Sequence, residues 1–199
     1  MSALATQAGV IEMHSGRVIN LADPDPATIV IRDIAYALSN QCRFAGNVSR
    51  FWSVAAHCLY ARRVGIAAGY PHLKLGLQFH DAHEYVLGDI TTPTANAIGA
   101  GARLAALKDT ADEAIAAALG FPVDLLRDPV IKEIDRLVLF LEAHHLQRNR
   151  GATLMVEPPS MFDVRDFLHV RPPAVGRFRW TARHAFVAAY HRDLKELHR

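Results

Sequence analysis

Apolar side chains recur at helical spacing along most of this chain, and proline and glycine residues separate the periodic stretches. Residues three and four apart share one face of a helix, so the pattern predicts amphipathic helices rather than strands. We therefore predict an all-α bundle of about six or seven helices, preceded by a small N-terminal hairpin around Ser15-Gly16. The main expected helices span residues 29–40, 49–68, 71–87, 93–119, 129–148 and 180–197.

Length and charge narrow the possible classes of protein. The chain has 199 residues, of which 51% are hydrophobic, so we expect one domain over residues 1–199 with one buried core. The net charge is +2, and the charges alternate in sign, which argues against a nucleic-acid-binding face. No apolar run approaches the roughly 18 residues of a membrane span, and residues 1–10 lack a signal-peptide pattern. Cys42 and Cys58 form no CxxC motif, and we expect reduced thiols in a cytoplasmic protein.

The segment from Phe79 to Pro93 places charged groups within an apolar setting. We expect one helix from Pro71 to about Leu87, with His80, Asp81 and Glu84 on one patch because they are three and four residues apart. Two carboxylates and an imidazole crowded together destabilise a fold unless a cation or a substrate compensates. We interpret the patch as part of a divalent metal site. The plainer alternative is a hydrogen-bonded pair at the surface.

Two further residues qualify as ligands. His57 lies beside the apolar face of the helix expected over 49–68, and Asp135 lies beside the apolar stripe of the helix over 129–148. His57 could instead be a satisfied core histidine, and Asp135 could point to water or to a cationic partner. Together with His80 and Asp81, they offer two nitrogen and two oxygen ligands from three helices, a set that suits Mn, Fe, Co, Ni or Zn.

This ordered H…HD…D pattern resembles the HD superfamily of metal-dependent phosphohydrolases. The local match is closer to bacterial and phage HD-domain 5′-deoxynucleotidases and dNTP phosphohydrolases. The resemblance covers about residues 15–148 and leaves a helical extension over about 155–199. The shared pieces are Cys-Arg-Phe-Ala-Gly-Asn (42–47), Phe-Trp-Ser-Val-Ala-Ala-His (51–57), His-Asp-Ala-His-Glu (80–84) with Gly-Asp-Ile (88–90) and Pro93, and Glu-Ile-Asp (133–135).

The resemblance implies a role for each matching residue. Glu84 is similar to the residue that positions or activates the attacking water, and Asp89 to the acid that places the substrate and its leaving oxygen. Arg43 matches an arginine that reaches the phosphate, and Phe44 an aromatic residue near the sugar. The implied metal ligands are His57, His80, Asp81 and Asp135.

The implied activity is metal-dependent removal of phosphate from deoxynucleotides by a metal-activated water, with Mn, Co, Fe, Ni, Zn or Mg as the cofactor. The substrate is a deoxynucleoside 5′-monophosphate or a dNTP. Relatives carry a lysine where Thr94-Ala95-Asn96 follows Pro93 here, so the number of phosphates held stays open. The resemblance also implies a homo-oligomer, dimeric or higher. From the charge pattern and the lack of a long apolar run, we expect neither nucleic acid nor a membrane as a partner.

Other functions remain alternatives. A degenerate HD domain would sense a nucleotide without hydrolysing it, although it would be free to lose ligands that this chain keeps. An HD hydrolase acting on another phosphoester is equally compatible with the ligand set. A zinc protease is disfavoured because the sequence has no HExxH motif, and we expect His83 at the surface or behind a ligand.

Overall fold

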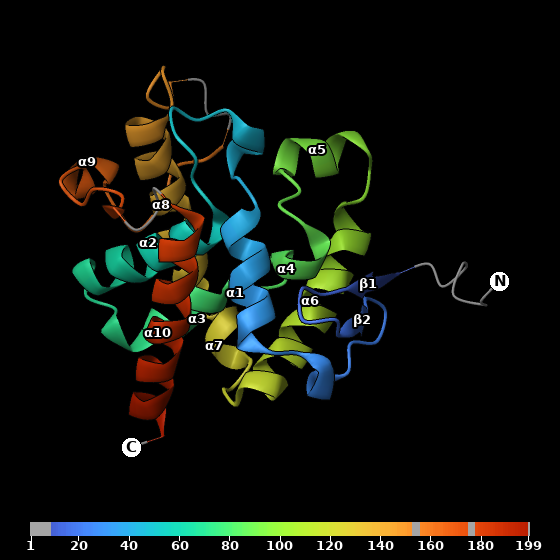
Figure 1. The fold of residues 1–199 in the computed structure, drawn as a ribbon. Helices are drawn as coiled ribbons and strands as arrows, with labels where there is room; N and C mark the ends of the chain where they lie inside the picture. Colours follow the sequence, from blue (N-terminus) through green and yellow to red (C-terminus); the bar gives the residue numbers. More distant parts are fainter. Residues whose placement is uncertain (1–8, 153–155, 175–177, 199) are drawn as a thin grey trace.

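The computed structural model describes residues 9–152, 156–174 and 178–198. These residues form an all-α bundle with a two-stranded antiparallel sheet at the N-terminal side, as the sequence predicts (Figure 1). The elements are β1 (Val10–Glu12), β2 (Val18–Asn20), η2 (Pro26–Thr28), α1 (Ile31–Asn40), η3 (Phe44–Gly46), α2 (Val54–Ala67), η4 (Pro71–Leu73), α3 (Lys74–Phe79), α4 (Glu84–Leu87), α5 (Thr92–Ala97), α6 (Gly101–Leu119), α7 (Asp124–Arg127), α8 (Pro129–Leu146), α9 (Val164–Phe167) and α10 (Arg179–Leu197).

Helix α2 is the centre of the bundle. It contacts α1, α3, α8 and α10, and most of its residues are buried, including Val54, Tyr60 and Val64. Burial of each large apolar side chain contributes about 1.5–3 kcal/mol relative to exposure, so α2 is held firmly on several sides. The metal-site histidine predicted on this helix, His57, therefore sits on a rigid element.

Two glycines allow α3 to pack closely. A Cβ atom at Gly65 of α2 would overlap Leu77 of α3, and a Cβ atom at Gly76 of α3 would overlap the carbonyl oxygen of Leu125. The missing side chains let α2, α3 and α7 approach one another more closely than any larger residue would permit. This close approach places the C-terminal end of α3, where His80 follows, against α2.

Helix α2 begins later than the sequence predicts. Ser53 is the N-cap, accepting a hydrogen bond from the N–H of Ala56, whereas Ser49 lies four residues before it. The reason is a short stretch of β-type pairing, in which the N–H of Arg43 donates to Trp52 O over 2.9 Å and Cys42 faces Ser53 in a β-bridge. This pairing keeps residues 51–53 extended and brings Arg43 beside the start of α2.

The single helix predicted from Pro71 to Leu87 is wrong, because the chain is interrupted between α3 and α4. Residues 80–83 form turns whose backbone hydrogen bonds span three residues, as between the N–H of Glu84 and Asp81 O over 3.1 Å. His80 Nδ1 lies 2.8 Å from Leu77 O, the carbonyl that an uninterrupted helix would pair with the N–H of Asp81. The side chain thus competes with the backbone at this position.

The C-terminal helix α10 packs against the bundle. It contacts α1, α2 and α3 (Figure 1). The guanidinium of Arg62 donates to both carboxylate oxygens of the buried Asp193, over 2.6 and 2.8 Å, and Gln78 donates to Phe186 O over 2.7 Å. Among the described helices, none combines the length and apolar character needed to cross a membrane.

Candidate metal centre

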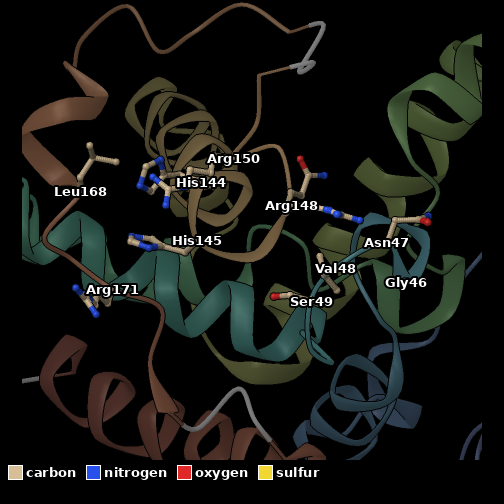
Figure 2. A pocket seen from close by; sticks show the side chains of 11 residues that line it. Gly46, Asn47, Val48, Ser49, His144, His145, Arg148, Arg150, Leu168 and Arg171 are labelled. Carbon is tan, nitrogen blue, oxygen red and sulfur yellow. The ribbon is translucent and has the colours of Figure 1, made fainter.

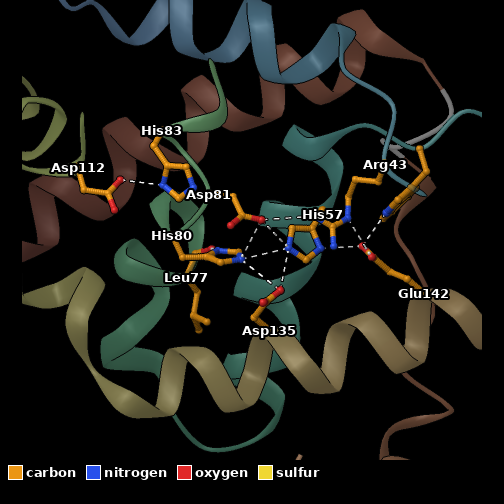
Figure 3. A network of polar contacts seen from close by, with 10 residues as sticks. Arg43, His57, Leu77, His80, Asp81, His83, Asp112, Asp135 and Glu142 are labelled. Carbon is orange, nitrogen blue, oxygen red and sulfur yellow. Dashed lines mark hydrogen bonds and ion pairs between the residues drawn. The ribbon is translucent and has the colours of Figure 1, made fainter. Parts of the chain in front are cut away.

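Side chains from α2, from the turn after α3 and from α8 meet at one point (Figure 3). His57 Nε2 lies 3.1 Å from Asp135 Oδ1 and 3.3 Å from Asp81 Oδ2. His80 Nε2 lies 3.4 Å from each of the same two oxygens, and 3.1 Å from His57 Nε2. The four ligand atoms lie within 4.8 Å of one another, so the predicted ligand set is brought together as a cluster.

The spacing of these atoms fits a metal ion. Ligand nitrogen and oxygen atoms lie about 2.0–2.2 Å from Zn²⁺, which places neighbouring ligands about 3 to 3.5 Å from each other. The four contacts between imidazole and carboxylate fall in this range. The side chain of Asp135 is 36% exposed and that of Asp81 17%, so the cluster opens toward solvent on the side of the carboxylates.

The second nitrogen of each imidazole is fixed by an acceptor. His57 Nδ1 lies 2.9 Å from Glu142 Oε1, and His80 Nδ1 lies 2.8 Å from Leu77 O. A neutral ring whose Nδ1 donates has a lone pair on Nε2. Two such lone pairs then face each other with two carboxylates beside them, an arrangement that a cation stabilises and that is repulsive without one.

The pKa shifts reflect the same concentration of negative charge. Burial alone would raise the pKa of Asp81, but His80, His57 and Arg43 hold it well below its usual range. Burial would lower the pKa of His80, but Asp81 and Asp135 raise it. The two carboxylates therefore favour a positive charge on the rings, and a divalent cation would displace those protons when it binds.

Glu142 supports His57 on the side away from the cluster, and it is not among the residues predicted from the sequence. Its side chain is fully buried; Oε1 accepts a hydrogen bond from Trp52 Nε1 over 2.7 Å, and Oε2 lies 3.2 Å from Arg43 Nε. The positive groups His57 and Arg43 lower the pKa of Glu142 although burial would raise it. A signal was present in the sequence, since Glu142 follows Asp135 by seven residues and so lies on the same face of α8, two turns later.

Arg43 lies at the edge of the cluster. Its Nη1 is 3.4 Å from Asp81 Oδ2, and its guanidinium lies over the ring of Phe44, 5.8 Å from the ring centroid. Phe44 and Ala45 have positive φ angles of 56° and 49°, which cost non-glycine residues about 1–2 kcal/mol each. The backbone is therefore strained in the loop directly after Arg43. Backbone strain of this kind is often found at functional sites.

Glu84 and Asp89 lie close to the cluster without being part of the four-ligand set. Burial and the nearby charge of Asp81 raise the pKa of Glu84 to about 9, and Asp89 adds to this shift. Glu84 Oε2 is buried and has no hydrogen-bond partner within the described part of the chain. Burial also raises the pKa of the half-buried Asp89. A carboxylate in this environment is a strong proton acceptor once ionised.

The other histidines lie outside this cluster. The sequence predicts His83 at the surface or behind a ligand. Its burial excludes the first alternative, and its Nδ1 is 3.0 Å from Asp112 Oδ1. His144 and His145 line a cleft of about 920 Å³ together with Arg148 and Arg171 (Figure 2). The lining of this cleft contains none of the four predicted ligands. This cleft and the cluster of the four predicted ligands are therefore different places.

Comparison with known proteins gives two relatives, and no family model matches. An uncharacterised protein of Rhodobacter capsulatus is 35% identical over 184 residues, which cover 86% of this chain and 92% of that protein. The uncharacterised protein YfdR of Escherichia coli is 33% identical over 142 residues, which cover 71% of this chain and 75% of YfdR. This chain belongs to their family. The matched length in both members is too great to reflect a single shared motif.

Proposed function

We propose that the protein is a metal-dependent phosphohydrolase of the HD type that removes phosphate from deoxynucleotides. The observation that carries the proposal is the convergence of His57, His80, Asp81 and Asp135, with Arg43 at its edge. A divalent cation held by this set would acidify a water molecule and neutralise charge on a phosphoryl oxygen.

Arg43 is the group suited to bind the phosphate. Its guanidinium presents several donors, of which Nε and Nη1 contact Glu142 and Asp81. These two carboxylates and the ring of Phe44 hold the guanidinium in one orientation. A positioned cation beside the ligand set would stabilise charge on the non-bridging oxygens as the phosphorus is attacked.

Glu84 is the group suited to take a proton from the attacking water. Its Oε2 atom is buried without a hydrogen-bond partner, and its ligand atom lies within 4.8 Å of that of Asp81. Asp89 lies near enough for its charge to act on Glu84. We assign Asp89 to the substrate side, where it would help to place the substrate and its leaving oxygen.

The test is phosphate release from the four dNMPs and the four dNTPs in parallel, each with Mn²⁺, Co²⁺, Mg²⁺ and Zn²⁺. We expect metal-dependent turnover that Asp81→Ala abolishes. We expect Glu84→Ala to lose turnover while the cation held by the two histidines stays bound. The preferred substrate in the screen distinguishes a monophosphatase from a triphosphate hydrolase.

Two results would contradict the proposal. If nucleotide and metal bind but none of the eight substrates turns over, the protein is a nucleotide sensor or acts on another phosphoester. If Glu84→Ala keeps full activity, the role given to Glu84 is wrong.

A further inference from the structure

A second group of possible ligands lies next to the first. Asp81, His83 and Glu84 each offer one ligand atom, and these atoms lie within 4.8 Å of one another. Asp81 and His83 lie in the turn between α3 and α4, and Glu84 is the first residue of α4. Asp81 belongs to both groups, so any ion bound here would neighbour an ion held by His57 and His80.

Two atoms of this second group are buried without partners. His83 and Glu84 have only 4% and 6% of their surface exposed, and His83 Nε2 and Glu84 Oε2 have no hydrogen-bond partner among the residues that the structure describes. A buried polar atom left unsatisfied costs about 1–3 kcal/mol. These unsatisfied atoms belong to residues whose ligand atoms lie within 4.8 Å of each other and of one from Asp81, so the position is suited to a cation.

Asp112 fixes the ring of His83. His83 Nδ1 lies 3.0 Å from Asp112 Oδ1, across the gap between the turn and α6. In Figure 3 the ring lies between Asp112 on one side and Asp81 on the other. A ring that donates from Nδ1 to a carboxylate presents the Nε2 lone pair on its other side, which is the arrangement found behind metal-bound histidines.

We propose that Asp81, His83 and Glu84 hold a second divalent cation, with Asp81 bridging the two ions and Asp112 orienting His83. The mixed nitrogen and oxygen ligands suit Mn²⁺, Fe²⁺, Co²⁺ or Zn²⁺. This inference rests on the proposed function for its catalytic meaning, and it gives Glu84 the role of a ligand to the second cation in place of the role of proton acceptor. Two ions about 3.5–4 Å apart can together stabilise the attacking and the leaving oxygen in phosphoryl transfer.

A second cation would explain the pair formed by His83 and Asp112, which a single cation at the first site does not explain. The pair formed by His83 and Asp112 is largely buried, since the two side chains are 6% and 17% exposed. Burying such a pair is seldom favourable compared with an apolar contact of similar shape. Ligand orientation for a cation explains why a histidine and an aspartate are used here.

The test is to count the cations bound to each chain. The metal-free protein is titrated with Mn²⁺, and bound metal is measured by elemental analysis and calorimetry. We expect two Mn²⁺ per wild-type chain, with the paramagnetic resonance signal of a coupled pair. His83→Ala should bind one uncoupled Mn²⁺, and the control His184→Ala, at an exposed histidine of α10, should bind two.

Asp112→Asn keeps the size of the side chain and serves if His83→Ala fails to fold. We expect it to weaken binding of the second Mn²⁺ by about 10- to 100-fold and to leave the first unchanged. Two Mn²⁺ in His83→Ala, or one in the wild type, would overturn the second site while leaving the first site intact. No bound Mn²⁺ in the wild type would overturn both sites.

Discussion

Glu142 accepts a hydrogen bond from His57 Nδ1 over 2.9 Å, and neither side chain is exposed to solvent. The contact lies on the side of the imidazole opposite to the ligand cluster. It orients the ring and keeps a proton on Nδ1, so that Nε2 stays free to bind a cation. A carboxylate in this position also increases the basicity of the ligand nitrogen.

Glu142→Gln should therefore weaken cation binding at the centre. The amide removes the negative charge that fixes His57 and that pairs with Arg43, whose Nε is 3.2 Å from Oε2. We expect the affinity to fall about 10- to 100-fold, measured by competition with a chelator of known affinity. Glu113→Gln is the matched control, because Glu113 is exposed on α6 and pairs with Arg127.

Thermal melts of both variants check that they fold. An affinity of Glu142→Gln equal to that of the control would show that Glu142 does not orient the ligand.

Ala45→Gly should stabilise the protein. Ala45 has φ 49° and ψ 33°, the left-handed conformation that glycine adopts without penalty, and its side chain is exposed. Relief of the strain exceeds the extra chain entropy of glycine in the unfolded state, so we expect a gain of roughly 0.5–1 kcal/mol in the free energy of unfolding.

Urea denaturation measures this gain. Ala105→Gly, at an exposed position inside α6, should have the opposite sign and lose about 0.5–1 kcal/mol. A loss of stability in Ala45→Gly would show that the Ala45 methyl group makes a contact worth more than the strain.

The all-α fold and the convergence of the four candidate ligands could both be predicted from the sequence. His57 and Asp135 lie beside apolar stripes, and the stripes must face the core, so polar residues next to them are forced toward the same interior. For Asp135 the relation depends on the helical periodicity of α8, whereas α2 is buried on most sides, so His57 was placed by the ordered motif as much as by an apolar stripe. For this reason residues 78 positions apart could be placed together without a structure.

Local competition between hydrogen bonds could not be read from the sequence. The break at residues 80–83 arises because His80 Nδ1 takes the carbonyl of Leu77, and the late start of α2 arises because residues 42–43 pair with 52–53. Both depend on contacts that form only when the chain is folded. Periodicity predicts which residues face the core but not which partner each backbone group selects.

Glycines in close contacts lead to a third prediction. Gly76→Ala would place a methyl group against the carbonyl oxygen of Leu125, and also 2.7 Å from Ile131 Cδ1. Backbone atoms of α7 cannot rotate away as a side chain can, so we expect a loss of about 1–3 kcal/mol in the free energy of unfolding.

Gly101→Ala is the matched control, since a Cβ atom at this first residue of α6 has open space around it. Chemical denaturation of the two variants measures the difference. Equal stabilities would mean that α3 and α7 separate at little cost.

Acid should weaken the contact between Glu133 of α8 and the residues around Ser160. One carboxylate oxygen of Glu133 accepts hydrogen bonds from Ser160 N over 2.6 Å, Ser160 Oγ over 2.9 Å and Met161 N over 3.2 Å. Burial would raise the pKa of Glu133, but these donors and Arg136 lower it.

A group whose pKa is lower in the folded state stabilises that state above its unfolded pKa of about 4.3, and the contribution disappears as the pH falls through the folded pKa. The stability difference between wild type and Glu133→Gln should thus be constant near neutral pH and shrink below about pH 5. Ser160→Ala keeps the backbone donors, so its difference in stability from wild type should be smaller and follow the same trend. A stability difference for Glu133→Gln that stays unchanged down to pH 3 would contradict the charge-based account.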